Sequence, residues 1–400
     1  MRLLCVNCGS STLKFDLLDV LDGGDEIRRS ASGLLDRLGD DAMLTFSVVG
    51  GASQKKKAAL PDHGIAMREV LSLLDDHGLL AGIDALGHRV VHGGPRFHAP
   101  VLIDEAVIEA IHAVSELAPL HNEPALKAIQ AAHDGLGDAA PMVATFDTAF
   151  YAELPEIASV YAIPRELSEK HSIRRYGFHG LAHRYMVQRF RELKPDVTHP
   201  RLVTLQLGNG CSATASVDAR PIDTSMGFTP LEGLIMGTRS GDIDPSLPLY
   251  LSEKEGLSTA EVASLLNTRS GLLGLSGRSH DMRDLLASAK TGDRKSELAI
   301  EAFCYRVKKY VGAYLAALGG ADAIIFGGGI GEHGAEVRQR ICARMEWAGI
   351  KLDAGRNVAA SGLEARISDD SSAVGVWVVP VDEAAVIARD VFVCLEAQGT

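Results

Sequence analysis

Hydrophobic and polar positions alternate at the start of the chain, in residues 1–20, around the polar stretch "NCGSST". This alternation predicts two strands joined by a tight turn, rather than a strand that leads into a helix. The same order recurs at residues 202–217, "LVTLQLGNGCSATASV", where an apolar run breaks at Gly-Asn-Gly and then resumes with small residues. We therefore expect a second β-hairpin just past the middle of the chain.

Other segments show helical spacing of apolar residues, or short apolar runs that end in glycine or polar residues. The predicted helices cover residues 62–77, 104–118, 259–267, 296–318 and 382–398. The predicted strands lie in "ALGHRVVHGG", "APMVATFDTAFY" and "AIIF". The two halves thus share an order of elements, which either a duplication or ordinary α/β alternation would produce.

Length and composition predict a globular protein with two domains. A chain of 400 residues exceeds the usual size of a single hydrophobic core, and 46% of its residues are hydrophobic. The formal net charge of -12 argues against nucleic acid or an anionic membrane as the main partner. No apolar run approaches the roughly 20 residues of a membrane span, and no signal peptide is recognisable, so we expect a cytoplasmic location.

Six cysteines in a chain of this length are expected to be reduced thiols rather than a disulfide framework. Cys5 and Cys8 form a Cys-x-x-Cys pair, which could indicate redox or metal chemistry. No second pair completes a zinc set, and Cys5 lies in an apolar strand pattern. A structural role is therefore favoured.

Three glycine-containing segments each follow an apolar strand, at residues 7–12, 208–212 and 327–331. Glycine allows a phosphate to approach the backbone closely, and exposed N–H groups supply positive potential. A single segment of this kind is more often a plain turn. Three together favour the binding of a phosphorylated ligand.

The segment 223–245 is a long loop rich in Gly, Ser, Thr and charge, and loops of this length are usually functional or disordered. Arg239 lies in it and either binds an anion or pairs with Asp242 or Asp244. Arg89 lies in an apolar strand pattern, where an unpaired guanidinium would be costly, so it must face a partner or an anionic ligand.

Histidines and carboxylates in similar settings are further candidates. His121, His179 and His92 could act in a site, although a histidine near apolar residues is more often structural. "YGFHG" strengthens the case for His179, because aromatic and glycine neighbours can fix its ring. Asp147 and Glu383 could bind a metal ion or cap a helix.

These segments resemble the acetokinase family, within the superfamily of acetate and sugar kinases and actin. The resemblance spans essentially the whole chain and rests on "VNCGSSTLKF", "HRVVHGG", "APLHN", "FDTAF", "IRRYGFHG", "LGNG", "DTSMGFTPLEGLIMGTRSGD", "SGLLGLSG", "GGGIGE" and "VDEAAVIARD". It implies an α/β fold, a duplicated actin-like (ribonuclease H-like) fold of two domains with a central cleft. Residues 1–148 plus 385–400 would form the first domain. Residues 149–384 would form the second, with the adenosine site and a dimer interface.

The resemblance also implies a reaction, the reversible in-line transfer of a phosphoryl group from ATP to acetate, giving acetyl phosphate and ADP. The catalytic residues would be Asp147, Arg89, Arg239, His179 and His121. The two arginines would bind the acetate carboxylate, His179 would donate to the transition state, and no general base would be needed. Asn7, Asp147 and Glu383 would hold or orient Mg²⁺ (Mn²⁺ is an alternative), because this ion prefers oxygen ligands. Orientation of the acetate carboxylate is the alternative role for Asp147.

Binding residues follow from the same resemblance. The acetate methyl would lie against Val91, Leu120, Phe178 and Pro230, next to Arg89. The nucleotide would contact Lys14, Gln206, Leu207, Gly208, Asn209, Gly210, Asp281, Met282, Arg283, Gly328, Gly329, Ile330, Gly331 and His333. The chain departs from the family at Gln206, where histidine is usual, at His333, where asparagine is usual, at Leu181 and Ala182, and at Glu123.

Partners and alternatives complete the expectation. The resemblance implies ATP, ADP, acetate and acetyl phosphate as substrates and a homodimer, with neither nucleic acid nor membrane as a partner. A propionate or butyrate kinase would share the fold and most motifs. A non-catalytic, ATP-driven binding protein on the same fold is the alternative from another class. It is disfavoured because such a protein has no use for two arginines around a carboxylate-sized anion.

Overall fold

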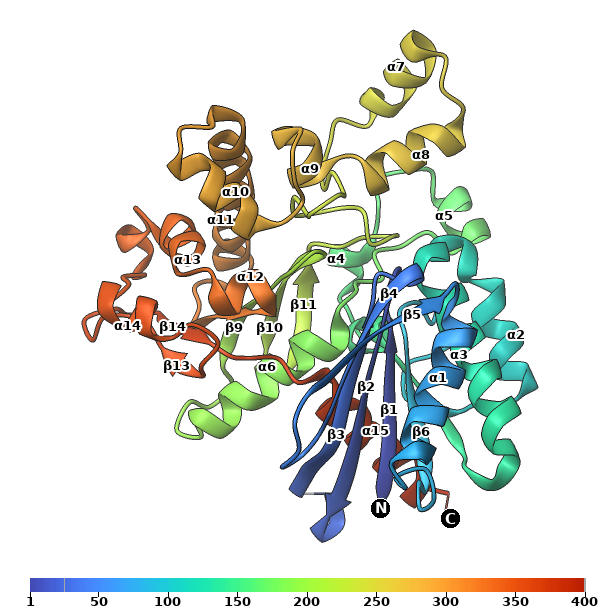
Figure 1. Ribbon diagram of the computed structural model, residues 1–400. Helices are drawn as coiled ribbons and strands as arrows, with labels where there is room; N and C mark the ends of the chain where they lie inside the picture. Colours follow the sequence, from blue (N-terminus) through green and yellow to red (C-terminus); the bar gives the residue numbers. More distant parts are fainter. Residues whose placement is uncertain (25, 399–400) are drawn as a thin grey trace. The chain divides into compact units, whose positions relative to one another are not determined.

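The computed structural model describes residues 1–24 and 26–398 (Figure 1). The chain forms two compact units. The first comprises Met1–Ala152 together with Asp382–Thr400, and the second comprises Glu153–Val381. Among the residues described, no helix has both the length and the hydropathy needed to cross a membrane.

The first unit is built on an eight-stranded sheet of order β5-β4-β3-β2-β1-β6-β8-β7. Its strands are β1 (Arg2–Cys8), β2 (Thr12–Leu21), β3 (Glu26–Asp36), β4 (Gly39–Val48), β5 (Gln54–Leu60), β6 (Ala85–Val90), β7 (Val101–Leu102) and β8 (Met142–Phe146). Strands β1 to β5 form an antiparallel meander, whereas β6 and β8 run parallel to β1. The predicted hairpin at residues 1–20 is therefore confirmed.

Helices cover both faces of this sheet: α1 (His63–Asp76), α2 (Glu105–Ala113), α3 (Pro119–Leu136) and α15 (Glu383–Glu396). Met67 of α1 and Ile129 of α3 share a buried core with Leu4 of β1. On the opposite face a Cβ at Gly87 of β6 would lie 2.3 Å from Cγ2 of Ile387, so α15 packs directly on the strand there. The terminal helix thus closes the first unit.

The second unit is built on a six-stranded sheet of order β11-β10-β9-β12-β14-β13. Its strands are β9 (Arg201–Leu207), β10 (Cys211–Val217), β11 (Arg220–Thr224), β12 (Ala323–Gly327), β13 (Ala365–Arg366) and β14 (Gly375–Val378). Its helices are α4 (Glu156–Ser159), α5 (Arg165–His171), α6 (Gly180–Leu193), α7 (Ser246–Glu255), α8 (Thr259–Thr268), α9 (Gly271–Ser276), α10 (Met282–Lys290), α11 (Arg294–Leu318), α12 (Gly328–His333), α13 (Ala335–Cys342) and α14 (Ala354–Ala359).

The two units repeat one strand order. In the first, β3-β2-β1 is an antiparallel meander followed by the parallel strands β6 and β8. In the second, β11-β10-β9 is followed by the parallel strands β12 and β14. The predicted duplicated α/β fold is confirmed, and of the two explanations for the shared order of elements, duplication accounts for it.

Two local predictions differ from the structure, whereas the predicted reduced cysteines agree with it. The helix predicted at 104–118 ends at Ala113, and a separate helix, α3, begins at Pro119. Proline is tolerated at a helix's first position, so the "AP" dipeptide starts α3 rather than preventing it. The third glycine segment is not a simple turn, because Gly328 begins α12. Each of the six cysteines, all in the described part of the chain, is a free thiol.

Candidate active site

The first unit gathers polar side chains at the carboxyl end of β1. Asn7 pairs with Lys14 on β2 and with Arg89 on β6, so the three residues form one row across neighbouring strands. Residues in one row point to the same face of a sheet. This is the face on which α15 packs, because Gly87 lies two residues before Arg89 on the same strand.

Arg89 is bound on several sides. Its Nε donates to Oδ1 of Asp147 at 3.1 Å and its Nη2 to Oδ2 at 2.6 Å, a bidentate pair with a fully buried carboxylate. Its Nη1 donates to Oδ1 of Asn7 at 2.9 Å and lies 3.6 Å from Oε2 of Glu383. Burial opposes the charge, but the carboxylates of Asp147 and Glu383 outweigh it and raise the pKa of Arg89. The arginine is therefore a fixed cation.

Glu383 is the first residue of α15, but its neighbour caps the helix. Asp382 is the N-cap, and its side chain accepts from the backbone N–H of Ala385. Oε2 of Glu383 instead accepts a hydrogen bond of 2.6 Å from Nδ2 of Asn7. The capping explanation for Glu383 is therefore wrong, since this carboxylate reaches across to the end of β1.

Asn7, Asp147 and Glu383 supply the oxygen atoms that could hold a metal. They are one amide and two carboxylates around Arg89, and both contacts of Glu383 described above use Oε2, so that Oε1 is the oxygen available to a ligand as far as the described residues show. Within residues 1–24 and 26–398 no three or more His, Cys, Asp or Glu side chains are grouped to enclose a metal. This donor set fits Mg²⁺, which takes oxygen ligands and retains water, and does not fit a closed structural site.

A second group in the first unit surrounds the start of α3. Asn122 accepts from the backbone N–H of His92 at 3.1 Å, and its Nδ2 donates to the carbonyl of His92 at 3.0 Å. This reciprocal pair ties the buried Val91, next to His92, to the first turn of α3, where Leu120 and His121 lie. His92 is itself fully buried, and its Nδ1 accepts from the N–H of Gly94, which favours a structural role.

His179 lies at the start of α6, in the second unit. It is the N-cap residue and adopts the left-handed backbone conformation, with φ of 56°, which is uncommon for a residue other than glycine. Its Nδ1 lies 2.8 Å from Oγ of Ser212, and the same hydroxyl lies 2.8 Å from Nε2 of the buried His183. Nδ1 of His183 is 2.7 Å from Oγ1 of Thr204. A chain of polar contacts therefore orients the ring of His179.

The Gly-Asn-Gly turn lies between His179 and Arg239. A Cβ at Gly210 would be 3.2 Å from Nε2 of His179 and 4.0 Å from Nη1 of Arg239. The backbone N–H of Gly237 donates to the carbonyl of Asn209 at 2.9 Å, which joins the loop of residues 223–245 to the turn. An imidazole, a guanidinium and a glycine turn thus meet within one unit.

Arg239 makes a different set of contacts from Arg89. Its Nη1 donates to the carbonyl of Pro230 at 3.0 Å and lies 4.0 Å from Sδ of Met236. Asp242, one of the two predicted ion-pair partners, accepts from the hydroxyl of Tyr310 and lies 3.4 Å from Nη1 of Arg306. Burial lowers the pKa of Arg239. A guanidinium in this setting is suited to an anionic ligand.

The third glycine segment packs on the second hairpin. Gly328 has φ of +73°, and a Cβ there would lie 2.6 Å from the carbonyl oxygen of Leu207. The fully buried Arg338 fixes the other end of α12, because its Nη1 donates to the carbonyls of Gly331 at 2.7 Å and Glu332 at 2.9 Å. The segments predicted to bind nucleotide at 207–210 and 328–331 are therefore neighbours.

Gln206 lies beside Gly327, its register partner on β12. Its Oε1 is buried, with no hydrogen-bond partner in the part of the chain that the structure describes, and would be 3.3 Å from a Cβ on Gly327. The side chain as a whole is partly exposed. Its amide nitrogen is therefore the group that can reach a ligand.

The remaining predicted binding residues are more dispersed. Asp281 caps α10 by accepting from the N–H of Arg283 and also pairs with that exposed guanidinium at 2.6 Å. Met282 is buried, and so is Phe178 next to His179. His333 ends α12 and lies 3.5 Å from Oγ of Ser361. The two contacts with Arg283 give Asp281 a local structural role in addition to any contact with a ligand.

Two positioning residues, His183 and His63, were not identified from the sequence. His183 lies four residues after His179, one helical turn on, and this spacing could have indicated a shared face of α6. His63, at the start of α1, contacts the carbonyl of Gly9 in the first hairpin turn through Nε2 at 2.8 Å. That contact joins residues 54 positions apart in the sequence, so no local pattern could have predicted it.

Comparisons with known proteins agree with this architecture. The sequence profile of the Acetokinase family matches residues 2–389. An acetate kinase of Solibacter usitatus is 47% identical over 410 aligned residues, covering 99% of this chain and 98% of the relative. The crystal structure of Porphyromonas gingivalis acetate kinase is 40% identical, with a TM-score of 0.88 over 98% of this chain and 99% of that chain.

A structure described as a propionate kinase, from Francisella tularensis, is similar as well. It is 37% identical, with a TM-score of 0.90, over 97% of this chain and 98% of that chain. Full-length coverage in each comparison means that the whole architecture is shared, and not one domain alone. The chain belongs to the Acetokinase family of carboxyl-group phosphotransferases.

Proposed function

We propose that this chain is an acetate kinase, which transfers the γ-phosphoryl group of ATP to acetate and catalyses the reverse reaction with acetyl phosphate and ADP. The observation that carries the proposal is the meeting of Arg239, His179 and the Gly210 turn within one unit. Phosphoryl transfer depends mainly on positioning and on neutralising charge on the equatorial oxygens. A guanidinium, an imidazole and a backbone turn supply those functions.

Two arginines, Arg89 and Arg239, are assigned to acetate and to the transferring phosphoryl group. Arg239 binds the acetate carboxylate with the planar fork of its guanidinium, whereas Arg89, whose Nε and Nη2 donate to Asp147, contributes a fixed positive charge to the binding of the carboxylate. Asp147 holds the fork of Arg89 in place through two hydrogen bonds. His179 and His121 donate to oxygens of the transition state. A carboxylate is already a nucleophile at neutral pH, so none of these residues has to remove a proton.

Mg²⁺, when bound, would neutralise phosphate charge and align the leaving group. Asn7 and Glu383 would hold it, with Asp147 orienting the bound waters, and Mn²⁺ is an alternative with similar ligand preferences. Nη1 of Arg89, on β6, already contacts Oδ1 of Asn7 and Oε2 of Glu383. Oε1 of Glu383 is consequently the atom with which the chain would reach the ion.

The nucleotide is assigned to the two neighbouring glycine segments. The hairpin turn at residues 207–210 would bind the phosphates together with Lys14 and Gln206. The segment 328–331 would bind the adenosine together with Asp281, Met282, Arg283 and His333. The close packing of Gly328 on Leu207 supports this division, because it brings the two segments side by side.

Propionate is the second candidate substrate, supported by the similarity to the Francisella tularensis propionate kinase. We favour acetate because the Solibacter usitatus relative, at 47% identity, and the Porphyromonas gingivalis structure, at 40%, are both acetate kinases and are more similar in sequence to this chain than the propionate kinase structure, at 37%. The residues assigned to the acetate methyl are Val91 and Leu120 of the first unit and Phe178 and Pro230 of the second.

The reverse reaction separates these candidates. Purified protein is mixed with MgADP and acetyl, propionyl or butyryl phosphate, and ATP is measured by luminescence. The highest kcat/KM with acetyl phosphate supports the proposal, whereas a higher value with propionyl phosphate would replace acetate by propionate. Absence of ATP with all three acyl phosphates would contradict an acyl kinase function.

A homodimer is part of the proposal. Helix α7 has no buried residue, yet Leu247, Leu249 and Tyr250 are exposed on it. A helix with exposed apolar side chains gains stability when a partner covers them. Sedimentation equilibrium would test this assembly. The cytoplasmic location stays a prediction.

A further inference from the structure

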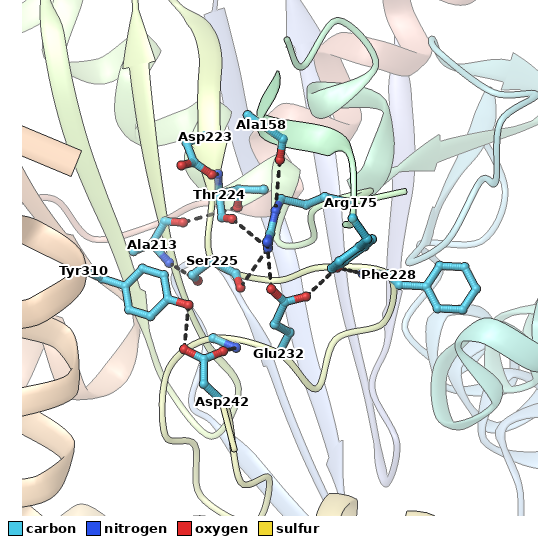
Figure 2. A network of polar contacts seen from close by, with 12 residues as sticks. Ala158, Arg175, Ala213, Asp223, Thr224, Ser225, Phe228, Glu232, Asp242 and Tyr310 are labelled. Carbon is cyan, nitrogen blue, oxygen red and sulfur yellow. Dashed lines mark hydrogen bonds and ion pairs between the residues drawn. The ribbon is translucent and has the colours of Figure 1, made fainter. Parts of the chain in front are cut away.

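Arg175 lies four residues before His179 and makes more contacts than its place in a loop would suggest (Figure 2). Its Nε donates to the carbonyl of Ala158 at 3.2 Å, and its Nη1 to the carbonyls of Thr224 at 3.2 Å and Ser225 at 3.4 Å. Its Nη2 donates to Oε1 of Glu232 at 2.7 Å. One guanidinium therefore joins three separate segments of the second unit.

Glu232 is held by a second donor. The hydroxyl of Tyr161 donates to Oε2 of Glu232 and accepts from the backbone N–H of Phe228 at 2.8 Å. Burial, together with the adjacent carboxylate, raises the pKa of Tyr161, so the phenol stays a donor. The guanidinium of Arg175 also lies 5.6 Å from the centre of the Tyr161 ring.

The carboxylate of Glu232 lies directly over Gly227. A Cβ at Gly227 would be 1.7 Å from Oε2 of Glu232 and 2.0 Å from the hydroxyl of Tyr161. No side chain can occupy that space without displacing the carboxylate. The backbone of the loop is thus shaped to receive Glu232 at this point.

Glu232 is one anchor of this loop, and Asp242, later in the loop, is a second. Oδ1 of Asp242 accepts from the N–H of Gly233 at 2.7 Å, and Oδ2 accepts from the hydroxyl of Tyr310 at 2.8 Å (Figure 2). Arg306 donates to the carbonyl of Gly233 at 2.9 Å. The stretch between the anchors includes Arg239, whose Nη1 in turn donates to the carbonyl of Pro230.

We propose that Arg175 and Tyr161 are positioning residues, which act through Glu232 to fix the loop that carries Pro230 and Arg239. The inference rests on the proposed roles of those two residues. Arg175 also lies in the same short segment as Phe178 and His179, so a single side chain couples the two stretches of the second unit that are assigned to the acid and the transferring phosphoryl group. Neither Arg175 nor Tyr161 is assigned a contact with substrate.

The test measures kcat and KM for acetate in Arg175→Ala, Tyr161→Phe and Glu232→Gln, with ADP affinity measured by calorimetry. We expect kcat/KM for acetate to fall by about 10- to 100-fold in Arg175→Ala, because small displacements of a positioned group have effects of this size. Tyr161→Phe, which removes only the hydroxyl, should show a smaller loss. ADP affinity should stay within about threefold, since the contacts that Arg175 makes with described residues do not involve residues 207–212 or 327–331.

Arg201→Ala is the matched control. Arg201 also makes several contacts, pairing with Asp322 at 3.2 Å and donating to the carbonyl of Gly319, but at the starts of β9 and β12. It should lose stability without a change in kcat/KM for acetate. An equal fall in this control would overturn the assignment of a local positioning role.

The Arg239→Lys background distinguishes positioning from general stability. If Arg175 acts through the loop of Arg239, Arg175→Ala should have much less effect in that background than in the wild type. Fully additive losses would contradict the inference. If Arg175→Ala does not fold, Tyr161→Phe and Glu232→Gln decide the question, because each alters only one polar group.

Failure of the inference and failure of the proposed function give different results. A wild-type protein without acyl kinase activity would contradict the proposed function. An active wild type in which Arg175→Ala and Tyr161→Phe keep kcat/KM within about threefold would overturn the positioning role and leave the function intact.

Discussion

Gln206 on β9 occupies the position that Asn7 occupies on β1. Asn7 is the next-to-last residue of its strand and pairs with Arg89 on the parallel neighbour, whereas Gln206 is the next-to-last residue of its strand and pairs with Gly327. Oδ1 of Asn7 therefore accepts from Arg89, but Oε1 of Gln206 is buried beside a glycine without a partner among the described residues. The second unit therefore repeats the position of Asn7 in the fold, but a glycine stands where the first unit has Arg89.

Replacement of Gln206 tests whether this amide reaches the phosphoryl group. We expect Gln206→Ala to lower kcat by roughly 10- to 100-fold with little change in KM for acetate, because a neutral amide donor contributes less than a principal oxyanion donor. Gln206→His should keep or raise kcat and add a pH dependence, with activity falling as pH rises through about 6.5 and the imidazolium is lost.

Gln188→Ala is the control for that series. Gln188 on α6 is also partly exposed, and its Oε1 has no partner in the described part of the chain. It is assigned no role in the reaction, so its replacement should leave kcat unchanged. If Gln206→Ala is as silent as Gln188→Ala, the side chain of Gln206 only packs beside the hairpin, and His121 and His179 are the remaining donors.

Arg89 is expected to be indispensable for turnover. Arg89→Ala should reduce kcat by about 10³-fold, the lower end for a cationic clamp on a transferring phosphoryl group. Arg89→Lys should restore only part of the activity, because an ammonium group lacks the bidentate fork that meets Asp147. Steady-state kinetics check this, and turnover of Arg89→Ala within about threefold of wild type would refute the role.

The size of the acid pocket depends on Val91 in our assignment. Val91→Ala should improve kcat/KM for propionate relative to acetate by about 1 to 3 kcal/mol, the usual value of one methylene in an apolar slot. Val90→Ala provides the comparison, because Val90 is equally buried but packs into the hydrophobic core of the first unit. An unchanged ratio in Val91→Ala would show that this side chain does not line the pocket.

Removal of the Glu383 charge should weaken metal binding. We expect Glu383→Gln to raise the Mg²⁺ concentration needed for half-maximal activity by about 10- to 100-fold. Mn²⁺ binding, followed by electron paramagnetic resonance in the presence of ADP, should weaken in parallel. Asp382→Asn removes the neighbouring carboxylate, which caps α15 and pairs with Arg29, and should affect stability only. Equal Mn²⁺ affinity in Glu383→Gln and wild type would exclude this ligand.

The sequence predicted those strands and helices that have a local pattern of apolar residues or glycine. Both hairpins, the strands at β6, β8 and β12, and the helices α1, α8, α11 and α15 follow from alternation, from helical spacing and from glycine. Helix α3 was not predicted from the sequence. Pro119 in fact starts the helix, and Pro124 lies inside it, where it costs a single backbone hydrogen bond.

Partners that are distant in sequence could not be predicted from local patterns. Asn7 and Glu383 are 376 residues apart. The family resemblance implied that both residues lie near a metal ion. Only the structure shows the direct hydrogen bond between them. The two hydrogen bonds between Asn122 and His92, and those from Arg175 to Glu232 and Ser225, likewise join separate segments. Such contacts depend on tertiary packing, which periodicity does not encode.

One measurement tests the central claim most directly: trapping of the acyl phosphate with hydroxylamine, in reactions of acetate and Mg²⁺ with ATP, GTP or pyrophosphate as the donor. We predict acetohydroxamate with ATP, at a rate that falls by about 10³-fold in Arg89→Ala. The series of donors also shows whether His333 has changed the nucleotide preference. No hydroxamate with any donor, or equal amounts from wild type and Arg89→Ala, would contradict the assignment of this chain as an acetate kinase that uses Arg89.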